Sequence, residues 1–293
     1  MITYDPKDWF TLIFQFHKSD TFRRLLPTML LIGAVTAVAC YLEKKYIHYP
    51  IPSLTVFHQI SGFIISLVLV FRINTAYDRW YEGRKLWGSL VNNSRNLALR
   101  LHLLIPANDK GLRNLAQQLI ASFPHALKVH LRATQGAYND ILFNSEMTAE
   151  GFEKAQHKPA FIASRLNHLC LRISLEHGKS HNDHLILSEN LGSLIDIAGA
   201  CERIRSTPIP YSYSIFIKKV IFLYIITMPF TFGMTIGYWS VPIVMIMFYA
   251  FASLELISEE IEDPFGTDAN DLPTDDIANR IQKNVEEILL SSS

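Results

Sequence analysis

The sequence is poor in cysteine and in charged residues. Its three cysteines, Cys40, Cys170 and Cys201, lie far apart, and Cys40 falls in an apolar run. An odd number of widely spaced cysteines does not suit a disulfide framework, so we expect small buried side chains. Charged residues make up 18% of the 293 residues, below the roughly 25% of ordinary soluble domains. The composition is therefore unusual for a purely soluble protein.

The chain also lacks an excess of charge and the common enzyme motifs. Its 27 basic residues balance its 27 acidic ones, and no basic tract or RNA-binding signature occurs, so nucleic acid is not an expected partner. There is no Gly-rich phosphate loop, CxxC, HExxH or GxSxG. We therefore expect no enzyme, no catalytic residues and no required cofactor.

Long runs without charge predict membrane helices. They cover residues 25–42, 46–71 and 220–254. About 20 apolar residues, rising roughly 1.5 Å each, cross the bilayer core, so each of the first two runs suits one helix. The third run suits two helices, because Gly233, Gly237 and Pro242 near its middle predict a helical hairpin. The sequence thus predicts an all-α membrane protein with four transmembrane helices, two at each end of the chain.

The second run passes directly into the charged sequence RINTAYDRWYEGRKLWG, which begins at Arg72. No Gly or Pro interrupts this stretch before Gly83. One helix is therefore expected to leave the membrane and to continue in water.

Basic residues near the ends of the runs predict the orientation of the chain. They are Lys7, Lys18, Arg23, Arg24, then Arg72, Arg79, Arg84, Lys85, and finally Arg203, Arg205, Lys218 and Lys219. The first loop offers only Lys44 and Lys45, and the last hairpin turn offers none. We expect a multi-pass protein of the plasma (inner) membrane, with both termini and the middle of the chain in the cytoplasm.

The middle of the chain is predicted to be helical. Leu97, Leu101 and Leu104 recur at three- and four-residue intervals, which is typical of an amphipathic helix. The predicted organisation is a cytoplasmic N-terminal segment at 1–24, a first transmembrane pair at 25–71, a helical cytoplasmic region at 72–219, a second transmembrane pair at 220–254 and an acidic cytoplasmic C-terminal segment at 255–293.

An apolar stripe on the second predicted helix is a candidate pore lining. Phe63, Leu67 and Phe71 stand four residues apart and share one face of a helix. In one interpretation the stripe packs on neighbouring helices or lipid. In the other, several copies turn it toward a common axis, where it forms a hydrophobic constriction that gates by dewetting. The spacing alone does not choose between them.

Two polar clusters are candidate metal sites. Glu260, Asp263, Asp268 and Asp271 surround a Pro-Phe-Gly sequence and offer oxygen atoms of the kind that Ca²⁺ binds, although the ligand spacing of an EF-hand is absent. The alternative is a solvated acidic loop. His177, His181 and His184 are spaced to share a helix face and hold a metal, or to form a polar helix start.

Three separate motifs carry a resemblance to a known family. The sequences VFRINTAYDRWYEGRKLWG, CERIRSTPIPYSY and EDPFGTDANDL, in this order and with two plus two membrane helices, resemble the bestrophin family in its bacterial branch. The resemblance implies a homopentamer around one axial pore within a lipid bilayer. It also implies passive conduction of small monovalent inorganic ions, with chloride favoured.

The resemblance assigns roles to particular residues. The neck of the family falls on Phe63, Leu67 and Phe71, and a second constriction falls near Leu185, or on His181, which would make it sensitive to pH. The calcium clasp of the animal members falls on four acidic positions, which are Glu260, Asp263, Asp268 and Asp271. In this chain Thr267, Ala269 and Asn270 interrupt that loop, so calcium is a possible ligand and not a required one.

Other functions remain open from the sequence. The first alternative is the same architecture with cation selectivity, because an apolar neck contributes no fixed charge. A transporter with alternating access usually has internal repeats and broken membrane helices, and neither is evident here. A membrane-bound scaffold or enzyme is the third alternative, and for an enzyme only the His177–His184 cluster offers convergent titratable groups.

Overall fold

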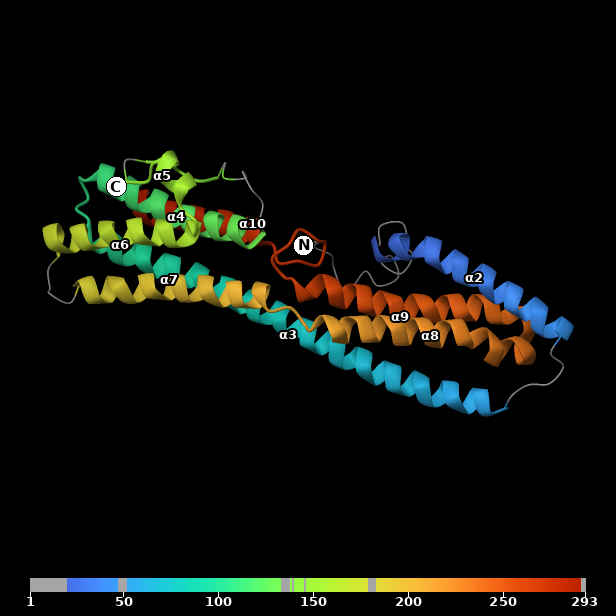
Figure 1. The fold of residues 1–293 in the computed structure, drawn as a ribbon. Helices are drawn as coiled ribbons and strands as arrows, with labels where there is room; N and C mark the ends of the chain where they lie inside the picture. Colours follow the sequence, from blue (N-terminus) through green and yellow to red (C-terminus); the bar gives the residue numbers. More distant parts are fainter. Residues whose placement is uncertain are drawn as a thin grey trace. The chain divides into compact units, whose positions relative to one another are not determined.

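The computed structural model describes residues 20–46, 52–132, 138, 140–144, 146–178 and 183–290. Regular structure in these residues is entirely helical, which confirms the all-α prediction (Figure 1). The helices are α2 (Asp20–Tyr46), α3 (Pro52–Leu104), α4 (Lys110–Arg132), α5 (Ala149–Lys154), α6 (Lys158–His177), α7 (Asp183–Ser206), α8 (Tyr211–Ile236), the 3-10 turn η1 (Gly237–Trp239), α9 (Ser240–Glu262) and α10 (Thr274–Leu290).

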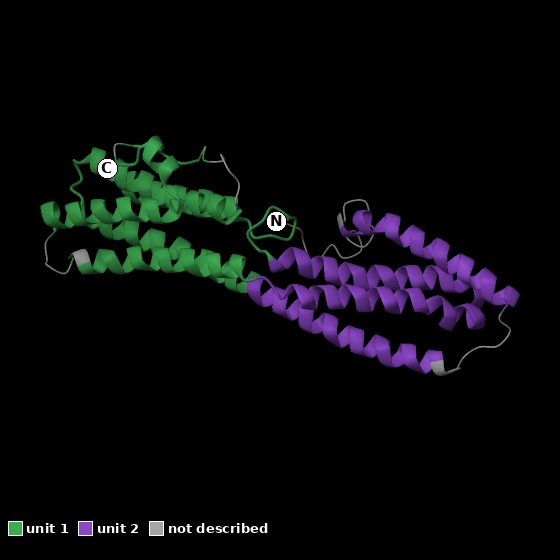
Figure 2. Ribbon diagram, in the orientation of Figure 1, with its two compact units in different colours: residues 1, 80–207, 263–293 green, residues 2–79, 208–262 purple. Residues whose placement is uncertain are grey.

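The chain forms two compact units (Figure 2). The apolar unit comprises segments 2–79 and 208–262, and the bundle unit comprises segments 80–207 and 263–293. Helix α3 contributes to both, because the division falls between Arg79 and Trp80 within this one helix.

The apolar unit contains α2, α8, α9 and the first part of α3. Its core joins Ile65 and Leu69 of α3 to Ile221 and Ile225 of α8 and to Phe251 of α9. By length and composition, three helical segments of the described chain are able to cross a membrane: Thr21–Tyr46, Leu54–Leu104 and Tyr211–Glu262. The last of these contains α8, η1 and α9.

The break between α8 and α9 lies where the sequence predicts a turn. Helix α8 ends before Gly237, whose φ of 57° is in the left-handed region that favours glycine. The turn η1 follows, and α9 then packs against α8. The long third run is therefore two helices rather than one.

The bundle unit surrounds one hydrophobic core. Helix α4 packs against both α6 and α10, and α6 packs against α7. Leu97 and Leu101 of α3 are completely buried in this core, and Leu104 is partly buried against it, as their spacing predicts. Trp87 of α3 and Phe123 of α4 are among its largest buried members.

All three cysteines are free and buried, as the sequence predicts. Burial raises the pKa of the Cys170 thiol to about 12 and has the same effect on Cys201. A buried thiol that keeps its proton at neutral pH is chemically inert, so these side chains serve packing.

Candidate functional site

The stripe of Phe63, Leu67 and Phe71 is exposed on α3. The three residues are 71%, 46% and 57% exposed, respectively. With 3.6 residues per helical turn, Leu69 and Arg72 lie on the opposite side, and both are only 1% exposed. The stripe therefore points away from the core of the apolar unit, and it is free to face lipid, another copy of the chain or a pore.

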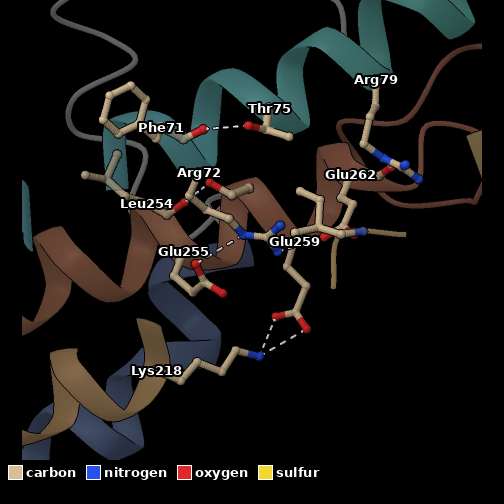
Figure 3. A network of polar contacts seen from close by, with 11 residues as sticks. Phe71, Arg72, Thr75, Arg79, Lys218, Leu254, Glu255, Glu259 and Glu262 are labelled. Atoms are coloured by element: carbon tan, nitrogen blue, oxygen red, sulfur yellow. Dashed lines mark hydrogen bonds and ion pairs between the residues drawn. The ribbon is translucent and has the colours of Figure 1, made fainter. Parts of the chain in front are cut away.

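A buried ion pair begins directly after this stripe. Arg72 donates a hydrogen bond from Nη2 to Glu262 Oε2 at 2.7 Å, and its Nε lies 3.6 Å from Glu255 Oε2. Figure 3 shows the Arg72 guanidinium directed toward these acids, whereas the ring of Phe71 points away from them. A buried guanidinium requires such partners, because burying an unpaired charge is very costly.

Glu262 connects three segments of the chain. Besides the bond from Arg72, its Oε1 accepts a hydrogen bond from the backbone N–H of Ile209 at 2.6 Å. Its backbone carbonyl accepts a further hydrogen bond from Arg79 Nε at 3.0 Å. We call these four residues, Arg72, Arg79, Ile209 and Glu262, the Glu262 node. The node joins the three motifs that carry the family resemblance, since each motif supplies at least one member.

A second ion pair near the node is exposed. Lys218 Nζ lies 3.1 Å from both carboxylate oxygens of Glu259 (Figure 3). The two side chains are 46% and 53% exposed, respectively. This pair differs from the Arg72 pair in burial and therefore in its expected contribution to stability.

The Pro-Phe-Gly turn packs against α3 within the bundle unit. Trp80 Nε1 donates a hydrogen bond to the carbonyl of Asn270 at 3.0 Å. A Cβ atom added at Gly83 would lie 3.2 Å from both Phe265 and Pro264. Glycine at position 83 is therefore what allows the turn to approach the helix so closely.

Two of the four predicted calcium ligands, Glu260 and Asp271, have protein partners. Glu260 pairs with Arg24 at 3.3 Å. Asp271 is only 2% exposed, and its Oδ2 accepts a hydrogen bond from the backbone N–H of Asp268 at 2.6 Å. Asp263 and Asp268 have exposed side chains. These contacts form an ion pair and a closed turn, and a calcium site at the four acidic residues stays a prediction from the sequence.

The residues proposed for a lower constriction are described only in part. Leu185 lies in the first turn of α7 and is 61% exposed. His181 lies outside the described residues, as does the side chain of His184. The structure therefore places Leu185 on a surface and leaves His181 as a prediction from the sequence.

A buried histidine in the second charge-free run belongs to none of the predicted sites. His58 is 2% exposed, and its two ring nitrogens lie 3.0 Å from Thr227 Oγ1 and 2.9 Å from Thr231 Oγ1. These bonds tie α3 to α8. A lone histidine within an apolar span is a signal for such a site, because polar groups in a membrane need partners.

Known proteins resemble the chain over almost its whole length. The family described as bacterial/fungal bestrophin protein matches residues 1–287. A voltage-dependent anion channel-forming protein from Nostoc sp. is 32% identical over 305 residues, which cover 98% of this chain and 94% of that protein. The voltage-dependent anion channel-forming protein YneE from Escherichia coli (strain K12) is 31% identical over 285 residues, with 96% and 92% covered.

The fold has a close counterpart among solved structures. The crystal structure of a bacterial bestrophin homologue from Klebsiella pneumoniae superimposes with a TM-score of 0.80 at 24% identity, covering 90% of this chain and 98% of that one. The names of the relatives as channel-forming proteins agree with the prediction that the chain is not an enzyme. The family match over residues 1–287 and the two relatives above 30% identity establish that the chain belongs to the bacterial/fungal bestrophin family.

Proposed function

We propose that the chain is one subunit of a homopentameric anion channel of the plasma (inner) membrane. Four membrane helices come from each subunit: α2, the first part of α3, α8 and α9. The observation that carries the proposal is the position of Phe63, Leu67 and Phe71 at the centre of the exposed face of α3, opposite its buried face.

In this proposal, α3 from each of five subunits lines the pore. The three apolar rings then form a narrow neck without fixed charge, where a thin water column is unstable and ions pass only when the neck is wetted. The Glu262 node begins at Arg72, the residue after Phe71, and it holds α3 to α9 and to the segment that follows α7. Fixing the helix at this point keeps the neck side chains in register.

A second constriction on the cytoplasmic side is assigned to Leu185 and, as an alternative, to His181. Leu185 is exposed at the start of α7, as a residue facing a lumen must be. A ring of His181 would instead give a pore that responds to pH near neutrality.

Anion selectivity is supported by the names of the relatives, which are anion channel-forming proteins. The apolar neck does not by itself choose the sign of the ion, so a cation-selective channel of the same architecture is the second candidate. A non-conducting membrane scaffold and a transporter are the remaining alternatives.

Two measurements on the purified full chain test the proposal. Native mass spectrometry in detergent is expected to give the mass of a pentamer. In a planar bilayer with a KCl gradient, the current is expected to reverse near the equilibrium potential of chloride. Reversal near the potassium potential would keep the channel and overturn its selectivity. A verified pentamer that carries no current at any voltage would contradict a channel.

A further inference from the structure

Two histidines and a glutamate meet at one point in the bundle unit. His130 lies in the last turn of α4, His157 directly precedes α6, and Glu202 lies near the end of α7. The ligand atoms of all three residues lie within 4.8 Å of one another. Three helices thus bring together residues that are far apart in the sequence. Only Glu202 belongs to one of the three family motifs, and the two histidines belong to none.

Hydrogen bonds orient the three side chains toward a common centre. Glu202 Oε1 lies 2.8 Å from His130 Nε2 and 2.6 Å from His157 Nε2. The two imidazole rings are tilted against each other with their centroids 4.7 Å apart. Both rings therefore present the same nitrogen, Nε2, to one carboxylate.

We propose that His130, His157 and Glu202 bind a divalent transition-metal ion such as Zn²⁺. Two imidazole nitrogens and one carboxylate are a common set of protein ligands for zinc, with water completing the coordination. The side chains are 26%, 41% and 33% exposed, respectively, so an ion and a water molecule can reach them from solvent.

The two contacts to Glu202 require only a small adjustment. Zinc ligands lie about 2.0–2.1 Å from the metal, so two ligand atoms of a tetrahedral site are about 3.3 Å apart. The present contacts to Glu202 are hydrogen bonds of 2.8 and 2.6 Å. Replacing their protons by the metal opens each contact by less than about 1 Å.

A neighbouring cation limits the affinity of the site. Arg205, which donates a hydrogen bond to the backbone carbonyl of His130 at 2.9 Å, adds a positive charge close by. We therefore expect saturable binding of moderate affinity.

His157 must change its hydrogen bonding when it binds the metal. Its Nδ1 now accepts a hydrogen bond from the backbone N–H of Ala160 at 3.0 Å. Coordination through Nε2 places the ring proton on Nδ1, so the Ala160 N–H then donates its hydrogen bond to water instead. The first turn of a helix tolerates this exchange, because its N–H groups have no partner within the helix.

Metal binding would join α4, α6 and α7 through one ion. This role is separate from conduction, since it concerns the stability of the bundle unit. The test uses full-length protein without a polyhistidine tag, purified in detergent and stripped with a chelator. Titration with ZnCl₂, followed by calorimetry, is expected to show one Zn²⁺ per chain and a rise in the melting temperature.

The variants His157→Ala and Glu202→Gln are expected to weaken binding about tenfold or more and to remove the thermal shift. Glu202→Gln keeps the size of the side chain, and its melting temperature without metal checks that it folds. His177→Ala is the matched control, because it alters the other histidine cluster and should leave binding unchanged. The absence of zinc binding in the parent protein, unaltered binding in both cluster variants, or loss of binding in His177→Ala would each overturn the proposal.

Discussion

Arg72 and Glu262 are separated by 190 positions in the sequence, yet the buried Arg72 and the 12% exposed Glu262 form a hydrogen-bonded ion pair of 2.7 Å. Arg72 follows the last residue of the apolar stripe, and Glu262 ends α9. The pair therefore holds the stripe-bearing helix to the end of α9 at the point where α3 becomes polar. Because Ile209 also bonds to Glu262, one carboxylate orients two other segments.

Breaking this pair is expected to destabilise the protein strongly. Arg72→Met leaves Glu255 and Glu262 without their cation, and loss of one partner of a buried pair costs about 3–5 kcal/mol. The melting temperature of the full chain in detergent measures the effect. The matched control is Lys218→Met, which breaks an exposed pair and should cost less than about 1 kcal/mol. Equal melting temperatures for the two variants would show that the Arg72 pair contributes no more than the surface pair.

Shortening the central side chain of the stripe is expected to increase conduction. Leu67→Ala removes apolar bulk from the proposed neck, so water enters more readily and the single-channel current or open probability rises. Planar bilayer recording measures both quantities. Leu30→Ala is the matched control, because Leu30 is a 59% exposed leucine on α2, outside the proposed pore. Unchanged current in Leu67→Ala, or an equal rise in the control, would argue that the stripe faces lipid or another subunit.

Local sequence predicted the helices of the apolar unit well, and the reason is physical. In a bilayer the backbone must satisfy its own hydrogen bonds, so a long apolar run has few alternatives to a helix. The hairpin turn was also predictable, because Gly233, Gly237 and Pro242 interrupt the longest run and Gly237 adopts a positive φ. The stripe of Phe63, Leu67 and Phe71 follows from helical periodicity alone.

The contacts between distant segments could not be predicted in the same way. Gly83 is the first residue that local rules would use to end α3, yet the helix continues to Leu104. A glycine is present at this position because Phe265 and Pro264, which lie far along the chain, pack closely against the helix there. The Glu262 node and the cluster of His130, His157 and Glu202 are likewise tertiary arrangements, which no short spacing in the sequence encodes.

The glycine at position 83 gives a prediction of its own. Gly83→Ala places a Cβ atom 3.2 Å from Phe265 and Pro264, and such overpacking costs about 1–3 kcal/mol. The melting temperature should fall. Gly192→Ala is the matched control, because Gly192 lies within α7 and, apart from its chain neighbours and its own helix backbone, no atom lies within 4 Å of an added Cβ. There the better helix propensity of alanine, about 1 kcal/mol, should raise the melting temperature or leave it unchanged. A fall of the same size in both variants would contradict the packing argument.

The buried histidine of α4 predicts how stability depends on pH. His125 Nε2 lies 3.1 Å from Gln282 Oε1 of α10, and its side chain is 2% exposed. Burial, together with the charge of Lys128, lowers the pKa of His125 below its ordinary value of 6.5 despite the opposing effects of Gln282, Asp140 and Asp275. As the pH falls, the unfolded chain therefore takes up a proton at this histidine before the folded chain does. By linkage, the stabilising contribution is complete above about pH 6.5 and is lost as the pH falls below it.

Melting temperatures at about pH 8 and about pH 5.5 measure this dependence, because histidine titrates between them. The parent protein should lose stability at the lower pH, and His125→Gln, which cannot take up a proton there, should lose less. Some pH dependence of stability should remain in His125→Gln, because burial also lowers the pKa of His130. His177→Gln controls for the removal of a partly exposed histidine and should behave as the parent does. If His125→Gln and the parent lose equal stability on acidification, proton uptake at His125 is not coupled to folding of the bundle unit.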